Sequence, residues 1–230
     1  MGRSLRLPTL NVLIEETMLS FDELSEHRIV PVVVVNDADR AAPLADALVA
    51  GGLPVAEVTL RTSAGLESIR RMAANPGLLV GAGTVLTATQ VDEVADAGAR
   101  FVVSPGLSRA VVERAQARGL LVLPGAVTPT EIMAALDLGL TTVKFFPAGQ
   151  YGGVATLKAL GEPFRGVRFV PTGGVSLDNL SEYLALPHVP AVGGTWMVKP
   201  ALVDAGDFAT ITRLAADAVA RAAQLDRSAS

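Results

Sequence analysis

One lysine in this sequence is placed where it could do chemistry. Lys144 lies in the apolar stretch of residues 141–148, which is typical of a short buried strand ending at Pro147. Removing an ammonium group from water is costly, so burial favours the neutral amine, and a neutral lysine amine can attack a ketone to form a Schiff base. The alternative is a lysine at a strand end whose long side chain reaches solvent. This stretch alone leaves both interpretations open.

A second apolar run, residues 55–60, contains a carboxylate, and an arginine follows it directly. Side chains alternate along a strand, so Glu57, Thr59 and Arg61 share one face. Glu57 and Arg61 would be ~13 Å apart on an extended strand, too far to neutralise each other. A carboxylate that meets a lysine is the usual pairing of a general acid–base with a nucleophile. A purely structural Glu57–Lys144 ion pair is the alternative.

Two glycine pairs follow two further apolar runs. Gly173 and Gly174 come after residues 167–171, and a second pair ending at Gly194 is followed by the hydroxyl of Thr195. Backbone N–H groups that no side chain covers can bind phosphate, most readily near a helix N-terminus. Glycine is also a common turn residue, so either pair alone is weak support.

The elements that must position these residues repeat along the chain. From about residue 29, apolar runs alternate with alanine-rich amphipathic stretches at a spacing of roughly 20 to 26 residues, the size of one strand–helix unit. The eight runs are residues 29–35, 55–60, 78–84, 100–104, 120–124, 141–146, 167–171 and 189–193. This pattern predicts an α/β fold, a single (β/α)8 TIM barrel over residues 21–226 with a short N-terminal extension over residues 1–20. A doubly wound sheet is less consistent, because the turn after the first run has no glycine.

Helix signals lie between the runs. Thr87 and Gln90 have the spacing of a capping box, as do Thr128 and Glu131. Ser176 is expected to cap a helix that ends near residue 186. These caps agree with the alternation of strands and helices.

Composition excludes several classes of protein. Half of the 230 residues are hydrophobic and 18% are charged, which indicates a folded globular chain. The net charge of −4 gives no reason to expect nucleic acid or an acidic membrane as a partner. There is no cysteine and there are only two histidines, so we expect neither a metal site nor a cofactor. The sequence has no run long enough for a membrane span and no secretory signal pattern, which favours the cytoplasm.

The predicted barrel gives these residues a common ligand. Active sites of this fold lie at the C-terminal ends of the strands, and the loops after the seventh and eighth strands often bind phosphate. Arg61 can bind a carboxylate through its planar fork, and the hydroxyl of Thr84 can assist it. With a ketone at Lys144, the predicted ligand is a phosphorylated 2-keto acid.

The motifs resemble those of the 2-keto-3-deoxy-6-phosphogluconate (KDPG) and 4-hydroxy-2-oxoglutarate (KHG) aldolase family. They are EVTLRT at 57–62, VGAGTVL at 80–86, SPG at 104–106, VKFFPA at 143–148, PTGGV at 171–175 and GGTW at 193–196. The resemblance implies a class I aldolase of the Entner–Doudoroff pathway, a homotrimer without a metal. Its reaction would release pyruvate and glyceraldehyde 3-phosphate from 2-dehydro-3-deoxy-6-phosphogluconate, and also split 4-hydroxy-2-oxoglutarate into pyruvate and glyoxylate.

The same resemblance implies a role for each candidate residue. Lys144 would form the Schiff base, Glu57 would transfer protons, and Arg61 and Thr84 would hold the carboxylate of the pyruvyl group. The phosphate would be held by Gly173, Gly174, Gly194 and Thr195, where relatives often have serine at position 195. Pro105 and Phe146 would line the pocket.

Three alternatives stay open at this point. A 2-dehydro-3-deoxy-6-phosphogalactonate aldolase would differ in the stereochemistry of its substrate at C4. A non-catalytic phosphate-binding or assembly-forming barrel would keep the scaffold without the reaction, although intact Lys144, Glu57 and Arg61 argue against it. A metal-dependent aldolase would be inactivated by chelators.

Overall fold

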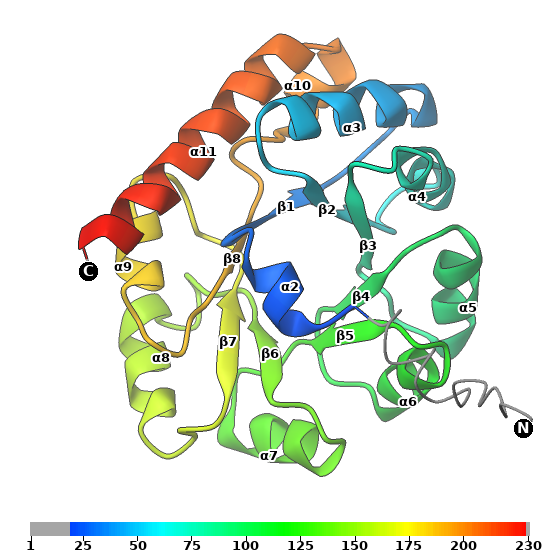
Figure 1. Cartoon of the computed structure of the whole chain (residues 1–230). Helices are drawn as coiled ribbons and strands as arrows, with labels where there is room; N and C mark the ends of the chain where they lie inside the picture. The colour runs from blue at the N-terminus through cyan, green and yellow to red at the C-terminus, as the bar shows by residue number, and fades with distance from the viewer. Residues whose placement is uncertain (1–18, 229–230) are drawn as a thin grey trace, which may run out of the picture.

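Eight short parallel strands form the centre of the computed structural model, which describes residues 19–228 (Figure 1). They are β1 Ile29–Val33, β2 Val55–Thr59, β3 Leu79–Gly83, β4 Phe101–Ser104, β5 Leu121–Pro124, β6 Thr142–Phe145, β7 Arg168–Pro171 and β8 Val192–Gly194. Each lies within, or overlaps, one of the eight apolar runs expected from the sequence. The predicted N-terminal extension falls outside the described residues except for its last two positions.

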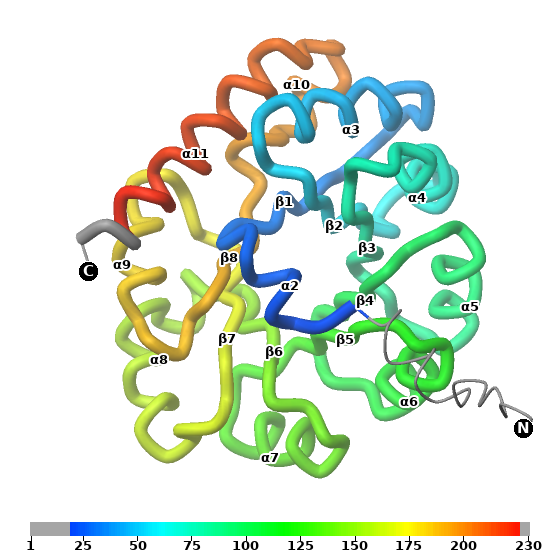
Figure 2. The backbone as a smooth tube through the Cα atoms, viewed as in Figure 1, coloured from blue at the N-terminus to red at the C-terminus, as the bar shows by residue number. Residues whose placement is uncertain are grey.

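The strands follow one another around a ring in the order of the sequence. One ladder runs β5-β4-β3-β2-β1-β8 and a second joins β6 to β7. Single parallel bridges, Gly125 with Lys144 and Thr172 with Gly193, connect the two ladders at both seams. The predicted (β/α)8 barrel is therefore confirmed, and Figure 2 shows the chain passing around the ring.

Helices surround the strands. They are α2 Phe21–Ser25, η1 Ala38–Arg40 (a 3-10 turn), α3 Ala41–Ala50, α4 Gly65–Ala73, α5 Ala88–Asp96, α6 Arg109–Ala117, α7 Pro129–Asp137, α8 Gly153–Gly161, α9 Leu180–Leu184, α10 Pro200–Ala205 and α11 Phe208–Ser228. None of these described helices has the length and apolar character needed to cross a membrane.

The helix caps were partly predictable. Both expected capping boxes are present, at Thr87 before α5 and at Thr128 before α7. Burial raises the pKa of Glu131 in the second box, but hydrogen bonds from the N–H groups of Val127 and Thr128 outweigh it and lower that pKa.

The expected cap at Ser176 is wrong. Helix α9 begins only at Leu180, and the side chain of Asn179 accepts a hydrogen bond from the backbone N–H of Ser176. Residues 177–179 consequently form a turn rather than the first turn of a helix.

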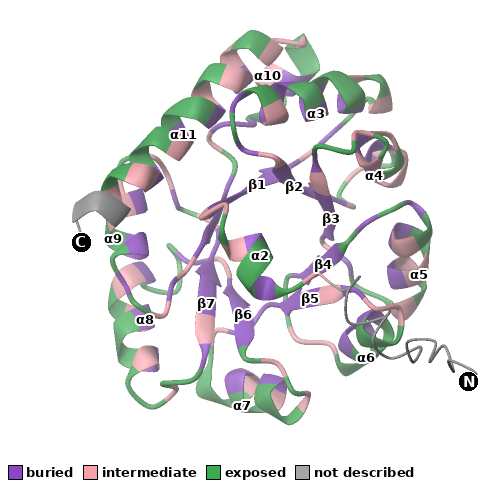
Figure 3. Cartoon of the chain, in the orientation of Figure 1, coloured by how far each residue is buried: buried purple, intermediate pink, exposed green. Residues whose placement is uncertain are grey.

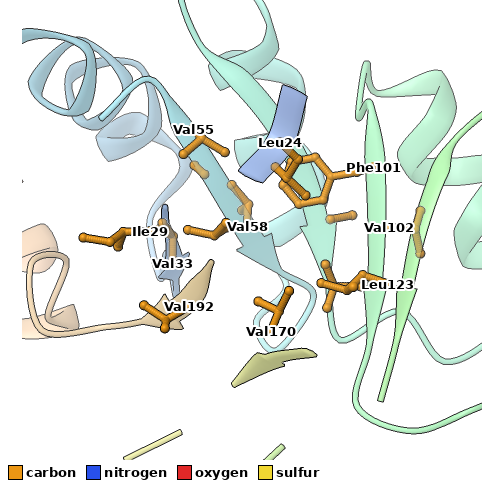
Figure 4. Packing of buried hydrophobic residues seen from close by; sticks show 14 of the residues in the cluster. Leu24, Ile29, Val33, Val55, Val58, Phe101, Val102, Leu123, Val170 and Val192 are labelled. Carbon is orange, nitrogen blue, oxygen red and sulfur yellow. The ribbon is translucent and has the colours of Figure 1, made fainter. Parts of the chain in front are cut away.

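The N-terminal end of the barrel is closed by α2. Phe21 and Leu24 of this helix are buried, and the guanidinium of Arg168 lies over the Phe21 ring while it pairs with Asp22. Arg168 is the first residue of β7, so this contact marks the end where strands begin. Leu24 belongs to the same hydrophobic cluster as the strand residues shown in Figure 4, and Figure 3 shows the strands almost entirely buried. Helix α2 does not cover the C-terminal end of the strands, where the candidate ligand-binding residues lie.

Candidate active site

Lys144 and Glu57 meet inside the barrel. Nζ of Lys144 on β6 donates hydrogen bonds to both carboxylate oxygens of Glu57 on β2, at 3.0 Å to Oε1 and 3.4 Å to Oε2. Each side chain is only 4% exposed. The interpretation of Lys144 as a solvent-reaching lysine is therefore wrong. A buried pair of charges loses much of its Coulomb gain to desolvation, so stability alone is a weak reason for it.

Phe146 comes directly after the lysine strand, β6. Lys144 and Phe146 share a face of the strand, and Nζ lies 5.2 Å from the centroid of the Phe146 ring. An aromatic face attracts a cation at this distance. The following peptide bond, Phe146–Pro147, is cis. The Phe146 ring therefore lies beside the amine.

Arg61 and Thr84 are also brought together, at the ends of adjacent strands. Nε of Arg61 donates to Oγ1 of Thr84 at 3.3 Å. No ion pair joins Arg61 to another described residue, so its terminal N–H groups are free to bind an anion. Thr84 has φ +61, a left-handed conformation that is unfavourable for a β-branched residue and is found most often at functional sites.

The two glycine pairs lie side by side because Thr172 and Gly193 are bridged. Gly173 and Gly174 have φ of +87 and +83, and the amide of Asn179 donates to the carbonyl of Gly174. Gly149 after β6 donates its N–H to the carbonyl of Gly173. The loop after β7 is therefore held from two sides in a conformation that suits glycine.

The loop after β8 is built around the single tryptophan. A Cβ on Gly194 would lie 1.8 Å from the ring of Trp196, so the indole covers this glycine closely. Thr195 between them is exposed. The hydroxyl of Thr195 is accessible to a ligand, and Trp196 supports the backbone that carries it.

Pro105 lies next to the lysine strand. A Cβ on Gly125 would stand 2.1 Å from the carbonyl oxygen of Pro105, and Gly125 is bridged to Lys144. The hydroxyl of Ser104 donates to the carbonyl of Gly106 and fixes the turn. The loop after β4 thus lies against the end of β5, next to the backbone of the lysine strand.

One polar residue of this end was not assigned a role from the sequence. Thr172 is buried, and its hydroxyl has no hydrogen-bond partner among residues 19–228. It lies so close to Gly193 that a Cβ there would be 2.3 Å from Oγ1. A buried hydroxyl without a partner is unfavourable, which points to a ligand atom as its partner. Its place beside a glycine pair was the available signal.

A large cavity lies away from these residues. A hollow of about 730 Å³ lies at the start of β7, between α8 and the residues after α9, and its walls include Lys158, Arg165 and His188. It is at the opposite end of β7 from Thr172 and contains none of the candidate residues. Among the described residues, no three His, Asp or Glu side chains are grouped to hold a metal ion.

The assembled groups define a chemistry. A buried amine lies beside a carboxylate that can carry its protons, which is the arrangement for attack on a carbonyl followed by acid–base steps. An arginine–threonine pair and two glycine loops lie at the same end of the strands, in positions that suit two anionic groups of one ligand.

Comparisons with known proteins agree with this chemistry. Residues 21–214 match the family model of KDPG and KHG aldolase. A KHG/KDPG aldolase of Escherichia coli is 47% identical over 192 residues, which are 83% of this chain and 90% of that protein.

Two solved structures have the same fold. The 2-keto-3-deoxy-6-phosphogluconate aldolase of Zymomonas mobilis with 3-phosphoglycerate is 45% identical at a TM-score of 0.82, covering 89% of this chain and 97% of that one. The KDPG aldolase of Legionella pneumophila, with pyruvate captured as a covalent carbinolamine, is 38% identical at a TM-score of 0.83, covering 86% and 97%.

Proposed function

The chain belongs to the KDPG and KHG aldolase family, and from that membership we propose that it cleaves 2-dehydro-3-deoxy-6-phosphogluconate to pyruvate and glyceraldehyde 3-phosphate. The chain is an aldolase, a carbon–carbon lyase. The observation that carries the proposal is the buried contact between Lys144 and Glu57 at 3.0 Å. It supplies the nucleophile and the proton carrier of a class I mechanism in one place.

The reaction begins at the amine. A proton passes from the Lys144 ammonium to the Glu57 carboxylate, and the free amine attacks the C2 ketone to form a carbinolamine. Glu57 then returns a proton to the C2 hydroxyl, which leaves as water, and the protonated imine remains. Because this pair is buried, both proton transfers take place in a site where the transferring groups are held within hydrogen-bond distance.

Cleavage uses the imine as an electron sink. Glu57 accepts the proton of the C4 hydroxyl, the C3–C4 bond breaks, and its electron pair moves into the imine to give an enamine. The aldehyde product, glyceraldehyde 3-phosphate, leaves. Protonation of the enamine at C3 and addition of water to the resulting imine release pyruvate and restore Lys144.

Binding groups at the strand ends orient the substrate. Arg61 and Thr84 hold the carboxylate next to C2, and the N–H groups of Gly173, Gly174 and Gly194 hold the phosphate with the hydroxyl of Thr195. The unpartnered hydroxyl of Thr172, which follows β7 and directly precedes Gly173, meets a hydroxyl of the carbon chain. Holding both ends of the substrate places C2 at the amine.

The same site should accept a shorter substrate. 4-Hydroxy-2-oxoglutarate keeps the 2-keto acid end that Arg61 and Lys144 recognise but has no phosphate. We expect cleavage to pyruvate and glyoxylate, with a higher KM because the glycine loops contribute less.

Localisation in the cytoplasm remains a prediction of the sequence.

The proposed assembly is a homotrimer. Met133 and Leu136 on α7 are 59% and 40% exposed, which is unusual for large apolar side chains and supports contact with another copy of the chain. Sedimentation of the purified protein should give a trimer mass, and a monomer at micromolar concentration would contradict this part of the proposal.

Kinetics on both C4 epimers test the proposed substrate. Release of pyruvate should be much faster from the gluconate compound than from the galactonate compound, and a chelator should leave the rate unchanged. A clear preference for the galactonate epimer would reassign the substrate, and a loss of activity with chelator would overturn the Schiff-base route.

A further inference from the structure

We propose that Gly83 is a positioning residue that holds the carboxylate of Glu57 against Lys144; this inference rests on the proposed function for its catalytic consequence. Gly83 is the last residue of β3, and its backbone pairs with Thr59 of β2. A Cβ on Gly83 would lie 2.3 Å from Oε1, 2.7 Å from Cγ and 2.9 Å from Cδ of Glu57. Real Cβ atoms essentially never approach other atoms this closely.

Space, not backbone conformation, requires glycine at this position. Gly83 is not among the glycines with positive φ, so an alanine could adopt its backbone angles. The nearest obstacle is the Glu57 side chain, to which the three nearest atoms all belong. Because Gly83 has no side chain, it leaves a recess in which the carboxylate of Glu57 lies.

Glu57 could not move away from position 83 without losing its contact with Lys144. Glu57 is only 3% exposed. Its Oε1 is the atom nearest to the position that a Cβ on Gly83 would take, and the same oxygen lies 3.0 Å from Nζ of Lys144. A methyl group at position 83 would push away the oxygen that exchanges protons with the amine. The residue after it, Thr84, bonds Arg61, so one short segment of β3 supports both the proton carrier and the carboxylate clamp.

The same strand contains a matched control. Gly81 faces the same side as Gly83, two residues earlier, and a Cβ there would lie 2.3 Å from the ring of Phe101. Phe101 is a buried hydrophobic residue of the barrel interior. Gly81→Ala and Gly83→Ala thus introduce the same methyl group on the same strand with the same shortest distance, 2.3 Å, but the nearest atoms belong to Phe101 in the first variant and to Glu57 in the second.

The first test is kinetic. Gly83→Ala should lower kcat by about 100-fold or more, within the range for a general acid–base. Its KM should stay within roughly 3-fold of the native value, and its pH–rate profile should shift. Gly81→Ala should keep the native pH–rate profile in its folded fraction. A native kcat and pH–rate profile for folded Gly83→Ala would overturn the proposal.

The second test does not depend on activity. In a Glu57→Ala/Lys144→Met background, which removes both charges, Gly83→Ala should lower Tm by less than half as much as it does in the native chain. Gly81→Ala should lower Tm equally in both backgrounds. If Gly83→Ala lowered Tm equally in both backgrounds, the new methyl group would not contact Glu57. If the native chain lacked aldolase activity, this cycle would still report the Gly83–Glu57 contact, so the two proposals fail separately.

Discussion

The Nζ of Lys144 and Oε1 of Glu57 are 3.0 Å apart although their strands, β6 and β2, lie on opposite sides of the eight-stranded ring. The contact therefore crosses the barrel interior. Both side chains are almost fully buried, at 4% exposed.

Glu57→Gln should separate proton transfer from nucleophilic attack. The amide is nearly isosteric and can still accept a hydrogen bond from Lys144, but it cannot take a proton. We expect kcat for cleavage to fall by roughly 10²–10⁴-fold. Steady-state assays of pyruvate release measure this, with the exposed Glu162→Gln as the control. A kcat within a few-fold of the native value would rule Glu57 out as the proton carrier.

Arg61→Lys should weaken binding of every 2-keto acid. Lysine keeps the charge but loses the planar pair of N–H groups that matches a carboxylate. We expect KM to rise by about 10-fold or more for both the phosphorylated and the unphosphorylated substrate, with a smaller effect on kcat. If KM stayed the same for both, the carboxylate would have to be bound elsewhere.

Thr195→Ala should distinguish the two substrates. A hydrogen bond to a charged group contributes about 1.5–3 kcal/mol, so kcat/KM for the phosphorylated substrate should fall roughly 10- to 100-fold. Cleavage of 4-hydroxy-2-oxoglutarate, which has no phosphate, should be almost unchanged. The variant Thr195→Ser should retain activity on both. An equal loss on both substrates would remove Thr195 from the phosphate site.

Thr172→Val should lower activity while it preserves or raises stability. The native hydroxyl is buried without a partner, and removing such a group relieves a cost of about 1–3 kcal/mol. Thermal unfolding should show a Tm no lower than the native one, whereas kcat/KM should fall by about 10-fold or more. A lower Tm with native kinetics would mean that the hydroxyl supports the fold and not the substrate.

The sequence was sufficient to predict the barrel and the meeting of Glu57 with Lys144 inside it. Apolar runs at regular spacing indicated eight strands, and alternation along residues 55–60 placed Glu57 and Arg61 on one face, as expected for a fold whose site is at the strand ends. The isolated lysine in its apolar stretch was a strong signal because charged residues are rarely buried without a partner.

Details that depend on three-dimensional neighbours were not predictable. Ser176 is a residue type that often caps helices, but its backbone N–H donates to the side chain of Asn179, and the helix begins only at Leu180. The need for glycine at position 83 arises from Glu57 on the adjacent strand, and only the strand register reveals that contact. The unpartnered hydroxyl of Thr172 likewise requires coordinates, because no sequence pattern records a missing partner.

Borohydride reduction in the presence of pyruvate, followed by peptide mass mapping, tests whether Lys144 forms the Schiff base. We expect one stable adduct, on Lys144, together with loss of activity. Lys144→Ala should form no adduct and should not turn over, whereas Lys158→Ala, whose side chain lies at the other end of the barrel, should behave as the native protein does. An adduct on Lys158 or Lys199, or full activity without any adduct on Lys144, would contradict the Schiff-base mechanism.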